Sequence, residues 1–576
     1  MASTPAASLT ECDQASLAEV RSLVTRAKAA QARLGELSQA QIDALVDAMA
    51  AAAATHAEPL ARLAVEETGY GVVADKVQKN LFAALDVHAF IRPMATVGVI
   101  ARHPERRLIE IAEPFGVVAA IVPSTNPTST AIYKLLIAIK ARCAIVVSAH
   151  PAAARCITAT TSLLHDAARS AGLPEGAIGW MTTVTLAGTQ ALMAAREVSV
   201  ILATGGLGLV RAAYSAGKPA YGVGPGNAPC YVESSADIAK AADDIVAGKT
   251  FDHGVLCSSP NAVVVDRAVA PALRAAMVHG GAHFLSGADA DRLAKVLVGP
   301  ERLPNPALVG RSAVYIARHA GVSVPDHTRA LVVELAGVGR DYPLSIEKLC
   351  PVLAYYEVAD WREGCERCTQ ILRYGGLGHT MSIHSQNDAV ILEFGLRKPA
   401  FRICVNTATT HGSIGLTTGL DPAMTLGCGG FGGNITSDNI TPRHLLNVKR
   451  VAYELRPRGR RAVPAAVPAA TSVAPAEAAP ALPRVPAAPA VPPIPAERLA
   501  LGIDRFLGER GAAPTPRPVE PPTPRSPESF VCEDDVRRAA AAGQRLLIGP
   551  RTIITPAARD AGEATSVFVW LDGTPR

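Results

Sequence analysis

Helical and extended hydrophobic patterns alternate along residues 14–455. In residues 14–90, apolar positions recur every three to four residues, which predicts helices, including 41–54 and 59–68. Short apolar runs then predict buried strands at 116–123, 144–148, 198–203, 262–265 and 402–405. Because helices alternating with buried strands are typical of parallel α/β layers, we expect an α/β fold over this part of the chain.

This pattern ends at Leu455. Residues 456–495 are mostly Ala, Pro and Val, and residues 511–528 have a similar character, so neither can bury a core and both predict disordered linkers. Between them, residues 496–510 predict a short amphipathic helix, whose apolar face would hold Leu499, Ile503, Phe506 and Leu507. Such a tethered helix can dock on the main body of its own chain or in a groove of another protein.

A small C-terminal segment, residues 529–576, follows the second linker. It shows a helix, a short strand and a helix that starts at a Thr-Pro pair, at residues 533–542, 545–549 and 555–560. We expect Glu533, Asp534 or Asp535 to cap the first helix. Since fewer than about 50 residues seldom form an adequate core alone, the segment is expected to need a partner.

Composition and charge narrow the class of protein. The chain has 576 residues, of which 49% are hydrophobic and 19% charged, and this balance argues against a wholly disordered protein. No apolar run is long enough to span a membrane, and the first residues have no basic start or apolar core of a signal peptide, so we expect a cytoplasmic protein. The net charge is +5, but residues 456–576 hold sixteen Arg and twelve Asp or Glu, so the main body is nearly neutral and offers no nucleic-acid surface.

Eleven cysteines are spread along the chain without a repeating framework. This odd number points to reduced thiols rather than to a disulfide scaffold. Cys365 and Cys368 form a CxxC pair in a helical stretch, but no second pair completes a zinc site, so we expect no bound metal.

Several glycine-rich and polar windows carry the chemical signal. They are Val-Pro-Ser-Thr-Asn-Pro-Thr-Ser-Thr at 122–130, Leu-Ala-Thr-Gly-Gly-Leu-Gly at 202–208, Gly-Val-Gly-Pro-Gly-Asn at 222–227 and Thr-Phe-Asp-His-Gly-Val-Leu-Cys-Ser-Ser at 250–259, with further windows at 347–353, 378–379 and 426–434. Together they resemble the CoA-acylating branch of the aldehyde dehydrogenase superfamily. The resemblance covers residues 14–455 and implies a homodimer or homotetramer.

The same resemblance divides the main body into two domains. A Rossmann-type nucleotide-binding domain would take residues 14–240 with a return segment at 420–455, and an α/β catalytic domain would take residues 241–419.

Cys257 is the expected nucleophile. Small residues flank it, which leaves space for an aldehyde carbon to reach the sulfur. Attack gives a thiohemiacetal, and the resemblance implies that the side-chain amide of Asn126 and the Cys257 backbone N–H face its oxygen. Loss of hydride to a nicotinamide then leaves a thioester on the sulfur. A cysteine taken alone is more often a small core residue, and the other ten cysteines are interpreted in that way.

A missing residue indicates what happens to the thioester. Hydrolytic aldehyde dehydrogenases carry a Glu before the nucleophile that activates water, whereas residues 221–229 here contain no carboxylate. Without that base, water attack should be slower by about 10²–10⁴-fold, while a thiol is intrinsically a better nucleophile. We therefore expect acyl transfer to coenzyme A, with a short-chain aldehyde and NAD as the other substrates. The identity of the aldehyde does not follow from the sequence.

The cofactor site is expected after the strand at 198–203. Thr204, Gly205 and Gly206 could let the backbone approach a dinucleotide pyrophosphate, and Gly208 continues the run. The resemblance implies that Glu347 binds the nicotinamide-side ribose and that the turn with Ser148 and His150 lies beside the adenosine. Many hydrolytic relatives have a Lys in that turn; its absence favours NAD but leaves NADP open.

Two histidines have open roles. His379 could act as an acid or base or orient CoA, or it could simply pack at the pocket wall. His253, four residues before Cys257, could lower the pKa of the thiol or be a solvated loop histidine.

The tail at 456–576 is not required for the chemistry. Its helix at 496–510 resembles encapsulation peptides of enzymes packaged in bacterial microcompartments, and residues 529–576 resemble segments appended to such enzymes. We therefore expect the protein inside a microcompartment, with shell or cargo proteins as partners; the alternatives for the tail are oligomer bracing and an inert extension. For the whole protein, the alternatives are an acyl-phosphate-type reductase on the same fold and a catalytically silent scaffold.

Overall fold

A computed structural model describes residues 9–456, 528–565 and 567–571. The chain forms two compact units, residues 1–460 and residues 461–576. Apart from residues 456 and 528, the two expected linkers and the amphipathic helix at 496–510 lie outside the described residues. No helix within the described ranges combines the length and the apolar character of a membrane span.

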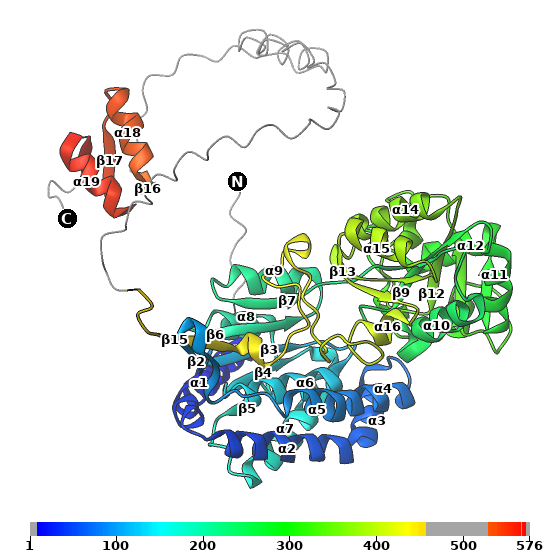
Figure 1. Ribbon diagram of the computed structural model, residues 1–576, viewed down its shortest axis with the longest axis horizontal. Coiled ribbons are helices and arrows are strands. Elements are labelled where there is room, and N and C mark those ends of the chain that lie inside the picture. The colour runs from blue at the N-terminus through cyan, green and yellow to red at the C-terminus, as the bar shows by residue number, and fades with distance from the viewer. Residues whose placement is uncertain (1–8, 457–527, 566, 572–576) are drawn as a thin grey trace, which may run out of the picture. The chain divides into compact units, whose positions relative to one another are not determined.

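Helices make up the start of the first unit, as the hydrophobic pattern predicts. They are α1 (Glu11–Gly35), α2 (Gln39–Thr55), α3 (Ala57–Thr68), α4 (Val73–Leu81) and α5 (Val87–Ile91). Capping boxes at Thr10 and Ser38 begin the first two, because each hydroxyl accepts a hydrogen bond from the backbone three residues later. Helix α2 packs against α6 and α7 beside the first sheet (Figure 1).

The first sheet has five parallel strands in the order β5-β4-β3-β6-β7. The strands are β3 (Val117–Val122), β4 (Ile145–Ala149), β5 (Ile178–Trp180), β6 (Val198–Thr204) and β7 (Ala220–Val223), and the helices that follow the first four are α6 (Pro127–Lys140), α7 (Ala154–Ser170), α8 (Leu186–Ala194) and α9 (Leu207–Ser215). The chain leaves β3 in one direction and reaches β6 on its other side. In such sheets ligands bind at the carboxyl ends of the strands where the order reverses.

A second sheet of seven parallel strands has the order β10-β11-β12-β9-β8-β13-β14. Its strands are β8 (Ala228–Val232), β9 (Pro260–Asp266), β10 (Ala282–Leu285), β11 (Ala330–Glu334), β12 (Val352–Val358), β13 (Gly378–His384) and β14 (Ala400–Val405). The helices around it are α10 (Ile238–Thr250), α11 (Ala270–His279), α12 (Gly287–Leu297), α13 (Ala313–His319), α14 (Trp361–Tyr374), α15 (Asp388–Arg397) and α16 (Thr409–Gly412). Since β8 pairs with β9 and β13, this sheet already begins at residue 228, before the expected domain boundary at 240.

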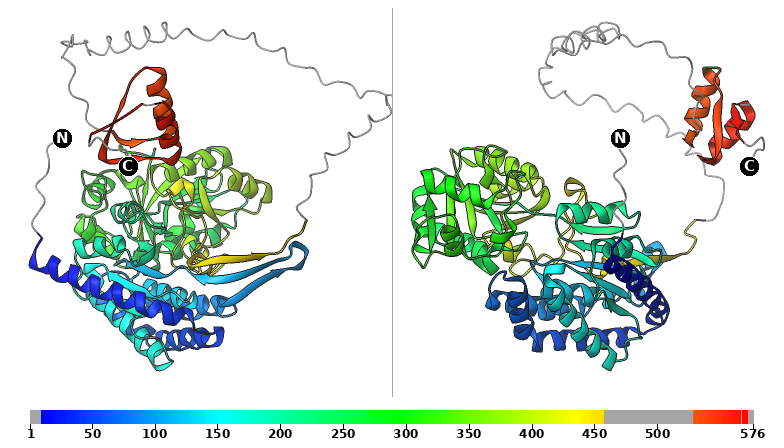
Figure 2. Two further views of the ribbon diagram at one scale, coloured as in Figure 1. Left: turned by 90° about the vertical axis from the view of Figure 1, so that its left-hand side faces the viewer. Right: turned by 180° about the vertical axis from the view of Figure 1, so that it is seen from behind.

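A third, antiparallel sheet joins distant parts of the first unit. Strand β15 (Leu446–Ala452) pairs with β2 (Leu108–Pro114), which pairs with β1 (Gly98–His103). Figure 2 shows these strands side by side as an extended arm of this unit. The chain thus returns to its N-terminal half after completing the second sheet.

The second unit is a small α/β arrangement around a parallel three-stranded sheet of order β16-β17-β18. Its elements are β16 (Glu528–Val531), α18 (Glu533–Ala541), β17 (Leu546–Ile554), α19 (Pro556–Thr565) and β18 (Phe568–Trp570). The prediction of an acidic cap for α18 is wrong, because Cys532 is the cap and Asp535 instead accepts a hydrogen bond from the Cys532 N–H at 2.9 Å. Thr555 does cap α19, since its hydroxyl accepts from the Ala558 N–H at 3.3 Å.

Candidate active site

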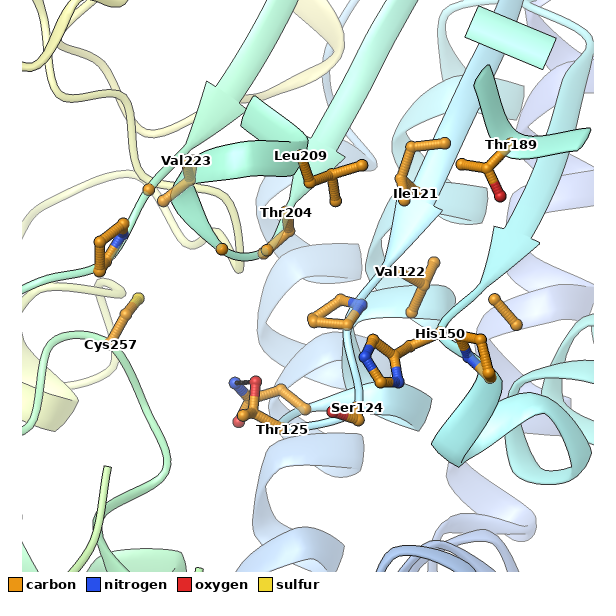
Figure 3. A pocket seen from close by; sticks show the side chains of 18 of the residues that line it. Ile121, Val122, Ser124, Thr125, His150, Thr189, Thr204, Leu209, Val223 and Cys257 are labelled. Atoms are coloured by element: carbon orange, nitrogen blue, oxygen red, sulfur yellow. Dashed lines mark hydrogen bonds between the residues drawn. The ribbon is translucent and has the colours of Figure 1, made fainter. Parts of the chain in front are cut away.

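A cavity of about 430 Å³ lies at the carboxyl ends of β3, β4 and β6. The loop that carries Cys257 and the segment that carries Glu347 close its other side. Figure 3 shows Cys257 at one end, His150 and Thr189 at the opposite end, and Thr204 between them. The elongated shape separates a site for chemistry from a site for an extended ligand.

Cys257 lines this cavity. Its side chain is partly exposed to the cavity, whereas eight of the other cysteines are buried in the core. Burial and the nearby Glu347 and Cys428 raise the pKa of the thiol to about 12, and the Arg402 guanidinium opposes this rise. The sulfur therefore carries a proton at neutral pH and has to lose it as it attacks.

Asn126 precedes α6 and lines the same cavity as Cys257. The Lys79 ammonium donates a hydrogen bond to its Oδ1 at 2.7 Å, and its Nδ2 donates to the Thr125 hydroxyl at 3.2 Å. One N–H of the amide remains for another acceptor. Asn126 and Cys257, which the sequence analysis paired, thus line the same cavity.

The loop after β6 fits a dinucleotide. The Thr204 hydroxyl is buried and has no hydrogen-bond partner among the described residues. At Gly206, the N-cap of α9, an added Cβ would have no atom within 4 Å, so the backbone is open to a ligand there. Gly205 is packed more tightly, because a Cβ would lie 2.7 Å from the Leu209 Cδ2. Gly208 does not line the cavity.

At the far end of the cavity, only one of the two expected residues is in place. His150 lines the cavity, and its Nδ1 accepts a hydrogen bond from the Ala152 N–H at 3.1 Å. Ser148 is fully buried behind the wall, where its hydroxyl bonds the Thr189 hydroxyl at 2.9 Å. Thr189 lines the cavity instead. The sequence of the turn at 148–151 could not predict this, because Thr189 lies elsewhere in the chain.

Glu347 brings a carboxyl group to the loop between β7 and β8. Its Oε1 accepts a hydrogen bond from the Gly226 N–H at 2.9 Å. Burial raises the pKa of Glu347 to about 8, so this group is mostly protonated at neutral pH and is a weak base there. The loop itself contains no carboxylate.

His379 lies in β13 and is completely buried. Its Nδ1 lies 2.9 Å from the Thr380 hydroxyl, which also accepts a hydrogen bond from Arg402 at 3.3 Å. Burial and Arg402 lower the pKa of His379 to about 3. A neutral ring whose Nε2 has no partner in the described part of the chain favours an orienting role over proton transfer.

His379 also lies next to the nucleophile loop. A Cβ on Gly226 would lie 3.4 Å from the His379 Cδ2 and 2.1 Å from the Cys257 carbonyl oxygen. His253, in contrast, donates from Nδ1 to the Gly310 carbonyl at 3.0 Å and lines a separate cavity beside Asp75. It is therefore in no position to activate the thiol.

The architecture defines a class: two parallel α/β lobes with a cysteine facing the cavity at the carboxyl ends of the first sheet's strands. The model of the aldehyde dehydrogenase family matches residues 3–305, and the chain belongs to this family. The bifunctional aldehyde-alcohol dehydrogenase AdhE of Escherichia coli K12 is 41% identical over 441 residues, which are 76% of this chain and 49% of that protein. The succinate-semialdehyde dehydrogenase (acetylating) of Clostridium kluyveri is 38% identical over 434 residues, 75% of this chain and 95% of that enzyme.

Solved structures show the same likeness. An acetylating aldehyde dehydrogenase from Geobacillus thermoglucosidasius is 48% identical with a TM-score of 0.77, over 79% of this chain and 100% of that one. A propionaldehyde dehydrogenase from the fucose utilisation bacterial microcompartment of Clostridium phytofermentans is 27% identical with a TM-score of 0.68, over 76% and 97% of the two chains. The chain spans about half the length of the first curated relatives that it matches.

Proposed function

We propose that this protein is a CoA-acylating aldehyde dehydrogenase, which converts a short-chain aldehyde, NAD and CoA into acyl-CoA and NADH. The observation that supports this most is that Cys257 and Asn126 line one cavity, together with the Thr204 hydroxyl and the open backbone at Gly206 that fit a dinucleotide. The relatives named as acylating or acetylating enzymes support the same reaction class.

The chain's own residues account for the covalent steps. The Cys257 sulfur bonds to the aldehyde carbon and its proton moves to the carbonyl oxygen, while the free N–H of Asn126 and the Cys257 backbone N–H stabilise the developing charge. The thiohemiacetal then loses a hydride from carbon and a proton from oxygen, which leaves an acyl thioester on Cys257. The thiol of CoA displaces the Cys257 sulfur, which regains its proton.

NAD supplies the hydride acceptor when it is bound. Thr204, Gly205 and Gly206 would hold its pyrophosphate, Glu347 would bind the nicotinamide-side ribose and His150 would lie beside the adenosine. The unpartnered Thr204 hydroxyl and the open backbone at Gly206 support this placement. NADP is the alternative; the absence of a Lys from the turn at 148–151 favours NAD but leaves NADP open.

The preference for CoA over water as the acyl acceptor is argued from the lack of a strong base near the thioester. The loop at 224–227 contains none, and Glu347 is mostly protonated at neutral pH. Burial holds His379 neutral, and its Nε2 has no hydrogen-bond partner among the described residues, so it is available for a hydrogen bond to CoA or, with the ring proton on Nε2, to the acyl oxygen. We propose it as a residue that orients the acyl acceptor.

The test is a panel of two- to four-carbon aldehydes mixed with protein and NAD, and with CoA, inorganic phosphate or neither. NADH is followed by absorbance, and C257A is the control. The proposal expects steady turnover only with CoA and none in the control. Turnover only with phosphate would identify an acyl-phosphate-type enzyme, and turnover in none of the mixtures would support a scaffold.

Packaging in a bacterial microcompartment is a second part of the proposal. The microcompartment enzyme among the similar structures supports this setting, and the C-terminal unit with its own small core gives the chain a separate element for contacts with shell or cargo proteins. Residues 496–510 are the other proposed contact. Co-expression of the full chain with shell proteins should co-localise the two, and removal of residues 456–576 should abolish this.

We also propose that the main body is a homodimer or homotetramer. Apolar side chains on the strands of the antiparallel arm are exposed, including Val99 on β1 and Val451 on β15. Light scattering of the purified protein would give its mass in solution, and a monomer would contradict this proposal.

A further inference from the structure

A buried charge cluster lies behind the catalytic pair. Lys76 and Lys79 occupy successive turns of α4, and both ammonium groups contact one oxygen of Asp252, Lys76 at 2.9 Å. The lysine side chains are 2% exposed and the Asp252 side chain is not exposed at all. Buried charges are tolerated only when they are paired and hydrogen-bonded. The hydrogen-bond partners of this cluster therefore show which parts of the site it holds in place.

Lys79 connects the cluster to Asn126. Besides Asp252, its ammonium donates to the Asn126 Oδ1 at 2.7 Å. If the amide turned over, its NH₂ group would face the ammonium and two donors would oppose each other in a buried place. Lys79 therefore fixes which end of the amide faces the cavity, and that end is the N–H donor.

Asp252 connects the same cluster to the nucleophile loop. It lies five residues before Cys257, and its backbone N–H donates to the Asp75 carboxylate at 2.7 Å. Its second carboxylate oxygen accepts from the Val72 N–H at 2.8 Å. The carboxylate also fills the space beside Gly71, where a Cβ would lie 1.8 Å from it.

The backbone at this point needs such support. Asp252 and His253 both have positive φ angles, 49° and 51°, in a region that L-residues rarely occupy. Burial lowers the pKa of Lys79 to about 8, against the opposing effect of Asp252, so the ammonium form still dominates at neutral pH.

We propose that Lys79 is a positioning residue that holds the amide of Asn126 in place, while its other partner, Asp252, ties it to the loop that carries Cys257. This inference rests on the proposed function, in which Asn126 and Cys257 stabilise and form the thiohemiacetal. Lys79 itself touches no reacting atom in that scheme and acts only through the amide.

The test compares K79M and K79Q in the full chain. The two replacements have similar length and both remove the charge, but only Gln keeps an N–H donor for the Asn126 oxygen. The expected result is a fall in kcat of about tenfold or more for K79M with a smaller change in KM, and a clearly smaller fall for K79Q. The double variant K79M/N126A should be no more than about twofold slower than N126A, because Lys79 acts through Asn126.

Each other outcome contradicts the inference. Equal losses in K79M and K79Q would assign the effect to the buried charge, and multiplied losses in the double variant would assign it to a general role in folding. K76M controls for that general role. It removes the other cation from Asp252 but no contact with the Asn126 side chain, so the fold-losses in kcat of K76M and N126A should multiply in the double variant. If K79M does not fold, K79Q alone and combined with N126A carries the same comparison.

The wild type separates this inference from the proposed function. If the wild type shows no CoA-dependent NADH formation, the proposed function fails. If the wild type and N126A behave as expected while K79M matches the wild type, only the inference on Lys79 fails.

Discussion

At the scale of single residues, the candidate site is controlled by what surrounds each polar group. The Cys257 thiol keeps its proton because it is buried, and the Asn126 amide turns an N–H donor to the cavity because a buried lysine binds its oxygen. Neither fact could be predicted from the sequence. Lys76 and Lys79 lie on a short, polar helical stretch that is typical of an exposed surface, and nothing local signals their burial.

Replacement of Asn126 tests the oxyanion role. We expect N126A to lower kcat by about 10²–10³-fold, because a donor aimed at developing charge is lost, with little change in KM. N126D keeps the shape but places a carboxyl group against the developing charge, and it should be at least as slow. A loss below about threefold in N126A would contradict the role.

The raised pKa of Cys257 predicts how the free enzyme reacts with iodoacetamide. Because a thiol with a pKa of about 12 is still mostly protonated at pH 10, the alkylation rate should keep rising up to pH 10 without levelling off, with a shallower slope near pH 8, where Glu347 ionises. An ordinary cysteine would level off near pH 9. Peptide mass spectrometry after timed alkylation gives this rate for Cys257 alone.

Glu347 provides the matched control for this measurement. Its carboxyl ionises above pH 8 or so and then opposes the thiolate, so E347Q should be alkylated faster than the wild type at pH 9 and similarly at pH 7. A wild-type rate that stops rising above pH 9, or no effect of E347Q at pH 9, would show that the thiol is activated in another way.

At the scale of elements, a few tight loops place the site between the two sheets. The carboxyl ends of β3 and β6 supply Asn126 and Thr204, while the amino ends of β9 and β13 supply Cys257 and His379. Hydrophobic periodicity correctly predicted the helices at the start and the strands β3, β4, β6, β9 and β14. It could not predict their order, since the partner of each strand is set by long-range packing.

The turn between β7 and β8 shows how closely these loops approach. A Cβ at Gly226 would lie 2.1 Å from the Cys257 carbonyl oxygen, so G226A has to move the nucleophile loop or its own backbone. We expect turnover to fall by about 10²-fold or more, with a lower melting temperature. G224A lies in the same turn with no atom within 4 Å of its Cβ and should cost far less. Similar losses in both variants would contradict this account of the packing.

At the scale of the whole molecule, the chain separates chemistry from its C-terminal unit. All residues of the candidate site lie in residues 1–460. Composition predicted the break after Leu455, and the Thr-Pro start of α19 was also correct, but the parallel pairing of β16, β17 and β18 required the structure. The acidic cap was misplaced because Cys532 is not a typical capping residue.

Removal of residues 456–576 tests this separation. The truncated protein should keep kcat and KM within about twofold of the full chain, since β15 and every residue of the site remain. Steady-state kinetics and a melting curve of the two proteins give the comparison. A loss of turnover with a lower melting temperature would instead show that the C-terminal residues brace the active fold.

The central claim is that Cys257 holds an acyl group that waits for a thiol. We would mix the protein with NAD and an aldehyde in the absence of CoA, quench at intervals and measure the mass of the peptide that contains Cys257. The account predicts that an acyl adduct accumulates on this residue, persists in water and disappears when CoA is added. An adduct that decays equally fast without CoA, or none at all while NADH forms, would contradict it.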